Sequence, residues 1–128
     1  MYDRELLIEK LQTLLAALRR IPRRFASIAA PSDFYLTEEG EDKLDAICMI
    51  LIAAGEELKN IDRKTEGKLF PQYPAVRWRG AMGMRDVLAH TYFHVDAEQL
   101  FNICKNDIPT MIVTLETIVS DLQQVERN

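Results

Sequence analysis

The sequence predicts an all-α protein, an up-and-down bundle of four to five antiparallel helices folded as one domain over residues 1–128. Apolar residues recur at steps of three and four, which is the period of an amphipathic helix. Gly and Pro number only five each, and no run has a strand pattern of useful length. Of the 128 residues 48% are hydrophobic, which is enough for one continuous core.

The first predicted helix carries an apolar stripe that continues past a proline. The stripe advances by steps of four and three, through Leu7, Leu11, Leu14, Leu18, Ile21, Phe25 and Ile28. Pro22 interrupts it, and a proline inside a helix removes a backbone hydrogen bond and clashes with the preceding turn. We therefore expect either a kink or two helices that share one face, followed by a connection at residues 30–33.

A second helix is expected from Thr37, a suitable N-cap because acidic residues fill the turn that follows it. Its apolar stripe consists of Leu44, Ile47, Leu51, Ala54, Leu58 and Ile61. Cys48 widens this stripe, as expected for a helix that is buried on more than one side. The helix should run to about Arg63, and residues 65–73 should form a loop.

The last third of the chain predicts three further helices. One begins near Pro74, because proline is tolerated in a first helical turn. Asp96 is expected to cap a short helix that runs through Cys104. Residues 106–109, Asn-Asp-Ile-Pro, predict a break and a restart. The last helix then carries the stripe Ile108, Met111, Leu115, Ile118, Leu122 and Val125.

Charge and composition limit the function classes. A net charge of −4 argues against a protein that coats DNA over its whole surface. Four arginines at 19–24 could form a local basic surface for RNA, although composition alone favours an ordinary solvated face. The charged N-terminal segment lacks the apolar core of a secretory signal, and no apolar run approaches the length of a membrane span. We expect Cys48 and Cys104 to be buried free thiols.

Titratable and aromatic side chains crowd residues 84–96. Asp86 and His90 are four residues apart, so on a helix the carboxylate can accept from the imidazole and fix its tautomer. Arg85 and His90 are five apart and would point in clearly different directions. Either the helix ends before His90, therefore, or the pair is completed across a dimer interface.

The spacing of these residues resembles a known motif. Arg85, His90 and Tyr92 stand as Arg-x4-His-x-Tyr, with the polar Asp86 directly after the arginine. This pattern resembles the motif of HepT-like toxins of the HEPN superfamily. The resemblance also covers the flanking segments 54–57, 78–86 and 95–109, and thus essentially the whole chain. Arg-x4-His alone is a weak signal, whereas the motif with its flanks is fairly specific.

The resemblance implies an endoribonuclease that acts without metal or another cofactor, in which the RNA 2′-hydroxyl attacks the adjacent phosphate. His90 would be the general acid–base, Arg85 would hold the phosphate, Asp86 would orient His90, and Tyr92 would contact RNA. It further implies a cytoplasmic homodimer with the site in the cleft between the two copies. The partner would be a minimal nucleotidyltransferase antitoxin that neutralises the toxin by adding AMP to Tyr92.

Three alternatives stand beside this interpretation. Arg85 and Asp86 could form an exposed ion pair, with His90 as a helix-end cap. His90 and His94, with Asp86 and Asp96 near them, have possible metal-ligand spacing, although no cysteine or further histidine lies nearby. The chain could also be a non-catalytic HEPN dimer that serves as a scaffold for a nucleotidyltransferase or a nucleic acid. An intact arginine, histidine and tyrosine set favours the nuclease.

Three neighbouring residues have a structural and a functional interpretation each. We expect Trp78 to be a packing or interface anchor rather than a platform for RNA stacking. We expect Phe93 to be a core aromatic residue at a helix end. Glu56 either faces the motif or merely flanks Gly55 where two helices cross, and the sequence leaves this open.

Overall fold

The computed structural model describes residues 3–127, except for the side chains of Tyr92, Glu126 and Arg127; Met1, Tyr2 and Asn128, and with them the first two residues of the charged N-terminal segment, lie outside the description. In this part of the chain every regular element is helical. The elements are α1 (Arg4–Leu18), α2 (Arg20–Phe25), α3 (Asp33–Leu36), α4 (Glu38–Lys64), η1 (Phe70–Gln72), α5 (Trp78–His90), η2 (Tyr92–His94), α6 (Ala97–Asn102), η3 (Ile103–Asp107) and α7 (Ile108–Arg127). The predicted all-α class is confirmed.

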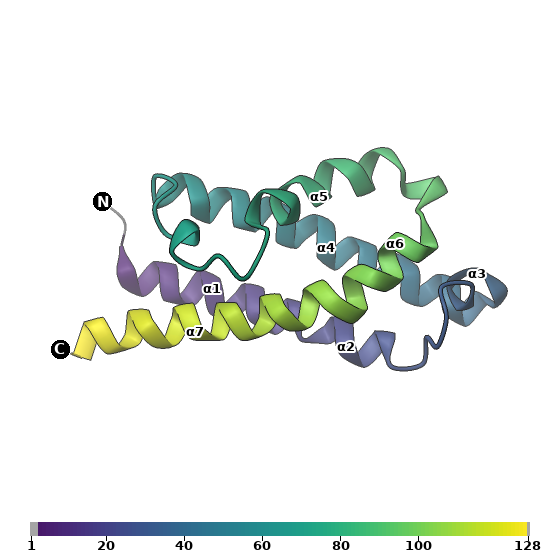
Figure 1. Ribbon diagram of the computed structural model, residues 1–128, viewed down its shortest axis with the longest axis horizontal. Helices are drawn as coiled ribbons and strands as arrows, with labels where there is room; N and C mark the ends of the chain where they lie inside the picture. Colours follow the sequence, from purple (N-terminus) through teal and green to yellow (C-terminus); the bar gives the residue numbers. More distant parts are fainter. Residues whose placement is uncertain (1–2, 128) are drawn as a thin grey trace.

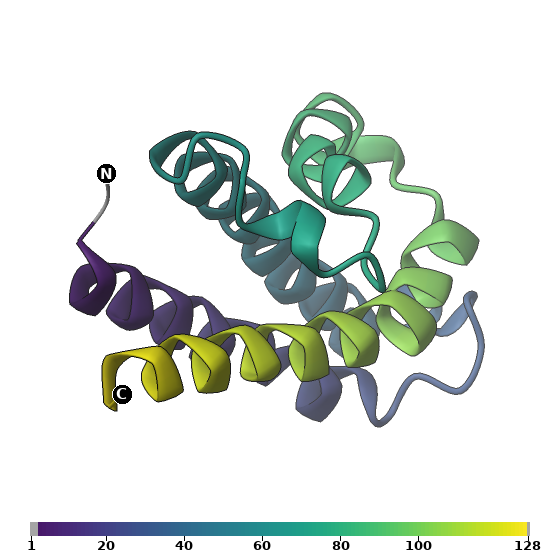
Figure 2. The ribbon, with the colours of Figure 1, turned by 60° about the vertical axis from the view of Figure 1, so that its left-hand side comes forward.

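The long helices α1, α4, α5 and α7 run alternately in opposite directions, as predicted for an up-and-down bundle (Figure 1). α4 packs mainly on α5, whereas α1 packs on α7 and on α4. In both views α1 and α7 lie along one side of the molecule, with α4 and α5 along the other (Figure 2). The C-terminal end of α5 lies at the end of the bundle away from both chain termini (Figure 1).

The predicted apolar stripes form the core. All residues of the α4 stripe are buried, and so are those of the first stripe apart from the half-buried Phe25. The α7 stripe is buried from Ile108 to Leu122, while Val125 is exposed. Cys48 and Cys104 are buried free thiols, as predicted, and burial raises the pKa of Cys48 to about 11 and that of Cys104 to about 12.

Local signals set several helix ends as expected. The first helix breaks at Arg19, three residues before Pro22, which has no N–H to donate to the preceding turn. Of the two outcomes predicted there, two helices that share one face is the one observed, because Ile21 of α2 is fully buried. The Thr37 hydroxyl caps α4 by accepting from the backbone N–H of Gly40, and Asp96 caps α6 by accepting from that of Gln99.

Several boundaries differ from the prediction. α6 ends at Asn102 rather than at Cys104, and the short helix α3, which was not predicted, precedes Thr37. α5 begins at Trp78 rather than near Pro74, because the Trp78 ring stacks on Phe70 at 4.2 Å and its indole N–H donates to the carbonyl of Tyr73. This contact confirms Trp78 as a packing anchor. No break occurs at residues 106–109: the π-helical segment η3 joins α6 to α7, with the Ile108 N–H donating to the carbonyl of Ile103. The wider π turn keeps the chain helical up to a residue that cannot donate, the proline that follows Ile108.

A helix that crosses a membrane must be both long and apolar. None of the helices formed by residues 3–127 is both long and apolar enough to cross a bilayer.

Candidate active site

Helix α5 carries both Arg85 and His90, because it ends at His90 itself. The spacing of five residues allowed two alternatives: a helix that ends before His90, or a pair completed across a dimer interface. The first is excluded. With 3.6 residues per turn, the two side chains leave the helix about 140° apart. Within one copy of the chain they point to different sides of α5.

Arg85 lies on the side of α5 that packs against α4. Its Nε atom is 3.3 Å from Oε2 of Glu56, and its Nη1 atom is 3.2 Å from Oδ1 of Asp86. The helices cross closely here, because a Cβ on Gly55 would lie 3.2 Å from both N and Cβ of Arg85. Glu56 therefore faces the motif and also flanks the crossing. The Arg85 side chain is 47% exposed, so its guanidinium remains open to a ligand.

Asp86 holds its carboxylate between two cations. Oδ2 accepts from Nζ of Lys59 at 3.3 Å, while Oδ1 accepts from Arg85. The hydrogen bond and charge of Lys59, followed by those of Arg85, hold the pKa of the Asp86 carboxyl below its ordinary value of 3.8. The expected contact of this carboxylate with His90 is replaced, because two charge-assisted bonds draw the carboxylate toward α4.

The His90 ring is oriented by the backbone of Asp86 rather than by its carboxylate. Its Nδ1 atom lies 2.8 Å from the carbonyl oxygen of Asp86. A carbonyl oxygen can only accept, so Nδ1 must carry the hydrogen and the neutral ring keeps its lone pair on Nε2. The side chain is exposed, so Nε2 faces solvent or a ligand. This ring can take a proton from a bound hydroxyl group.

The segment after α5 is a short 3-10 turn, η2. Tyr92 begins it, but the Tyr92 side chain lies outside the described part of the structure, so its role stays a prediction. Phe93 was expected in the core, and this is wrong: 88% of it is exposed, because η2 projects from the end of the bundle. Val87 is 51% exposed as well, so apolar side chains flank His90 in sequence on both sides.

A metal site at His90 and His94 would need these side chains and neighbouring carboxylates to converge on one point. Among residues 3–127, apart from the undescribed side chains, no group of three or more His, Cys, Asp or Glu is arranged to hold a metal ion. His90 ends α5 and His94 ends η2, so the two imidazoles do not share one helical face.

The sequence did not assign Lys59 to the site and left Glu56 undecided. Both lie on α4 beside the crossing, Glu56 next to Gly55 and Lys59 one turn further on. The signal was Gly55, since a glycine in a helix interior often marks a close approach, and residues four apart share a face. The partner helix could be identified only from the fold.

Comparisons with known proteins show the family of the chain. A family model described as "Ribonuclease HepT-like" matches residues 14–118. A protein of Methanocaldococcus jannaschii named "Putative RNase MJ0127" is 31% identical over 96 residues, which cover 75% of this chain and 74% of that protein. A Thermococcus cleftensis protein named "Probable ribonuclease HepT" is 39% identical over 66 residues, which cover 52% of this chain and 56% of that protein.

No solved structure matches the chain significantly. The match to the family model therefore establishes the family of the chain. It spans all of α4, α5 and α6, and with them Glu56, Lys59, Arg85, Asp86 and His90. The chain belongs to the ribonuclease HepT-like family.

Proposed function

We propose that this chain is a metal-independent endoribonuclease that cleaves RNA by attack of a 2′-hydroxyl on the adjacent phosphate. The family and the names of its relatives support a ribonuclease function. The observation that carries the mechanism is the bond between His90 Nδ1 and the Asp86 carbonyl. It leaves Nε2 of an exposed imidazole as the proton acceptor, which is the form that a general base requires.

The reaction uses groups that the RNA and the protein already contain. Nε2 of His90 takes the proton from the 2′-hydroxyl, and the 2′-oxygen forms a bond to phosphorus. The bond from phosphorus to the 5′-oxygen breaks, and the departing oxygen takes a proton from the His90 imidazolium, which returns the ring to its neutral form. The products are a 2′,3′-cyclic phosphate and a 5′-hydroxyl.

Arg85 stabilises the negative charge that develops on the phosphate oxygens. Glu56 and Asp86 engage Nε and Nη1, while Nη2 has no hydrogen bond among the described residues. A half-exposed planar cation fixed in this way is suited to phosphate. Preorganisation by Glu56 means that little reorientation is needed when the substrate binds.

The proposal includes a homodimer with Arg85 of one copy facing His90 of the other. The support is geometric, because the two side chains leave one helix about 140° apart. Two copies related by a twofold axis would form two equivalent sites. The exposed apolar side chains of Val87 and Phe93, each three residues from His90, suit an interface at this end of the bundle.

The proposed biological role is the toxin of a toxin–antitoxin pair whose antitoxin is a minimal nucleotidyltransferase. Tyr92 lies two residues after His90 and is the proposed acceptor of AMP. A phosphodiester there would bring negative charge and bulk close to the site and repel RNA. Coexpression with the partner should add the mass of AMP to wild type and not to Tyr92→Phe.

The chemistry is tested by the ends of the products. A single-stranded RNA cut in EDTA should yield 2′,3′-cyclic phosphate and 5′-hydroxyl ends. The same strand with a 2′-deoxynucleotide at the cut position should resist cleavage there. Cleavage of the deoxy strand, or 5′-phosphate ends, would exclude the proposed attack and point to an external water.

A further inference from the structure

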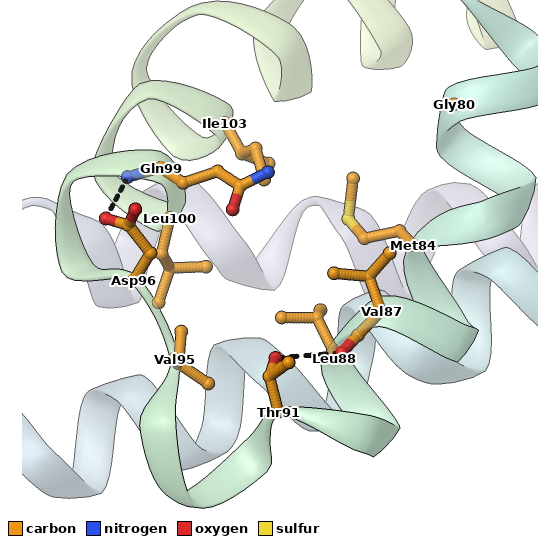
Figure 3. A pocket seen from close by; sticks show the side chains of 10 residues that line it. All are labelled: Gly80, Met84, Val87, Leu88, Thr91, Val95, Asp96, Gln99, Leu100 and Ile103. Carbon is orange, nitrogen blue, oxygen red and sulfur yellow. Dashed lines mark hydrogen bonds between the residues drawn. The ribbon is translucent and has the colours of Figure 1, made fainter.

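A cavity of about 100 Å³ lies between α5 and α6 (Figure 3). Met84, Val87 and Leu88 of α5 line one side, and Gln99 and Leu100 of α6 line the other. Figure 3 shows the side chains of the two helices facing one another across a gap, with Gln99 extending toward α5. No role in the proposed reaction accounts for this space.

The rim of the cavity adjoins His90. Val87 precedes His90 by three residues, and Thr91 follows it directly. Residues three apart on a helix are surface neighbours with Cβ atoms about 5–6 Å apart. The Thr91 hydroxyl donates to the Val87 carbonyl at 2.8 Å, which fixes this part of the rim. His90 itself does not line the cavity, but a group bound there would contact Val87 and Thr91, its neighbours on the helix surface and in sequence.

The lining combines apolar walls with three polar side chains, those of Thr91, Asp96 and Gln99. Met84 and Leu88 face Leu100, whereas Gln99 offers an amide that can both donate and accept. The backbone N–H of Gln99 donates to the capping Asp96 at 3.1 Å, which holds the first turn of α6 in place. The Gln99 amide has no hydrogen bond among the described residues. Apolar walls with a donor–acceptor amide between them suit the face and edge of a nucleobase.

The size of the space also suits a base. An apolar cavity of about 150 Å³ holds a benzene ring, so about 100 Å³ accepts most of one planar ring. The cavity continues into a groove of about 520 Å³, with which it shares Gly80, Met84, Gln99 and Ile103. A Cβ at Gly80 would meet only Cβ of Arg77, at 4.0 Å, so packing within the chain does not require glycine there. Arg77 lines the groove and supplies a cation for the RNA backbone.

We propose that this cavity binds one base of single-stranded RNA, that of the nucleotide whose 2′-hydroxyl is deprotonated by His90, and that Gln99 reads its edge. The inference rests on the proposed ribonuclease activity. With the base between α5 and α6, the ribose would lie at Val87 and Thr91, next to His90. The nuclease should consequently prefer one base at the cut position.

The preference is measured with four single-stranded RNAs that differ only in the nucleotide 5′ of one cut position. One bidentate contact discriminates bases by about 1–3 kcal/mol, or about 5- to 150-fold in rate. Wild type should show such a preference, and Gln99→Leu, which keeps the volume but removes the hydrogen bonds, should bring the four rates within about twofold while still cleaving. Gln124→Leu, the same change at an exposed position near the end of α7, should keep the wild-type preference.

A binding experiment separates the failure of this inference from that of the nuclease. Wild type and Gln99→Leu are titrated with the four oligonucleotides carrying a 2′-deoxynucleotide at the cut position. If wild type cleaves none of the RNAs, the proposed activity fails, and the binding data alone test the cavity. Equal base selectivity in wild type and Gln99→Leu, in whichever assay responds, would overturn the inference.

Two further experiments test whether a base of the oligonucleotide occupies the cavity. Gly80→Leu, whose side chain would project into the junction of cavity and groove, should fold normally and weaken oligonucleotide binding at least tenfold, and unchanged binding would contradict the inference. AMP at the oligonucleotide's concentration should not displace it. Displacement would reassign the cavity to a mononucleotide.

Discussion

The Nδ1 atom of His90 lies 2.8 Å from the backbone carbonyl oxygen of Asp86, four residues before it in α5. The bond assigns the hydrogen to Nδ1 and the lone pair to Nε2. Because the acceptor is backbone, the orientation of the ring does not depend on the Asp86 side chain. The carboxylate of the same residue serves Lys59 and Arg85 instead.

Asp86→Asn should therefore reduce kcat by less than about tenfold, far less than the loss of a general base, which is about 10²- to 10⁴-fold. Its amide oxygen can still accept from Lys59, while the backbone continues to hold His90. Single-turnover cleavage of one RNA by both proteins measures the ratio. A loss as large as that of His90→Ala would mean that the carboxylate itself orients the ring during the reaction.

The pH dependence of stability should distinguish the same pair of proteins. The Asp86 carboxyl has a lowered folded pKa, so its stabilising contribution is present above the unfolded pKa of about 3.9 and is lost as pH falls through the folded value. The difference in unfolding free energy between wild type and Asp86→Asn should be constant from about pH 5 to 8 and shrink below about pH 4. Urea titrations at several pH values measure it. A difference that changes between pH 6 and 8 would contradict the assignment.

The contribution of Arg85 to catalysis should depend on the planar geometry of its guanidinium more than on its charge. Arg85→Lys keeps the cation but cannot bind Glu56 and a phosphate in two planar contacts, so kcat/KM should fall at least about tenfold. Glu56→Gln should cost no more than about fivefold, because the ion pair is half exposed and such pairs contribute about 0–1 kcal/mol. Glu57→Gln is the matched control, since Glu57 faces Lys10 of α1 instead. Equal losses in Glu56→Gln and Glu57→Gln would remove Glu56 from the site.

The dimer is tested by mixing inactive variants. Arg85→Ala and His90→Ala should each be inactive, whereas a denatured and refolded mixture of the two should recover roughly a quarter of wild-type activity. Random pairing makes half the dimers mixed, and each mixed dimer has one intact site if Arg85 and His90 come from different copies. No recovery, with mixed dimers shown by mass spectrometry, would place both residues of each site in one copy.

The two glycines beside the site should respond oppositely to alanine. At Gly55 a methyl group would press on Ala81 and Arg85 at 3.2 Å, so Gly55→Ala should destabilise by about 1–3 kcal/mol. At Gly83 it would meet nothing within 4 Å, so Gly83→Ala should stabilise by about 0.5–1 kcal/mol through helix propensity. Thermal unfolding of both variants measures the contrast. Equal effects would show that the α4–α5 crossing is not tightly packed.

Much of the fold could be predicted because one period governs most of the chain. The stripes of α1, α4 and α7 follow steps of three and four, and the caps at Thr37 and Asp96 are local signals. The start of α5 could not be predicted, since it depends on the stacking of Trp78 on Phe70, a tertiary contact. The continuous path through η3 could not be predicted, because a proline usually marks a break, whereas here a π turn accommodates it.

The sequence indicates which residues are the candidates for the site, whereas their contacts depend on the fold. Arg85, Asp86 and His90 were named from their order, and helix geometry correctly separated Arg85 from His90. The partner of His90 was predicted as a carboxylate, because the i,i+4 rule treats side chains and not the backbone. Competition from Lys59 decided the outcome, and only the packing of α4 on α5 brings Lys59 to Asp86.

The most direct test of the central claim is cleavage of a single-stranded RNA in EDTA by wild type, His90→Ala and His94→Ala, each expressed without any partner protein and with Tyr92 shown to be unmodified. The chain has two histidines, so His94→Ala is the matched control for loss of an exposed imidazole. We predict that wild type and His94→Ala cleave alike, whereas His90→Ala is slower by at least about 10²-fold. Equal cleavage by all three proteins, or by none, would contradict catalysis by His90.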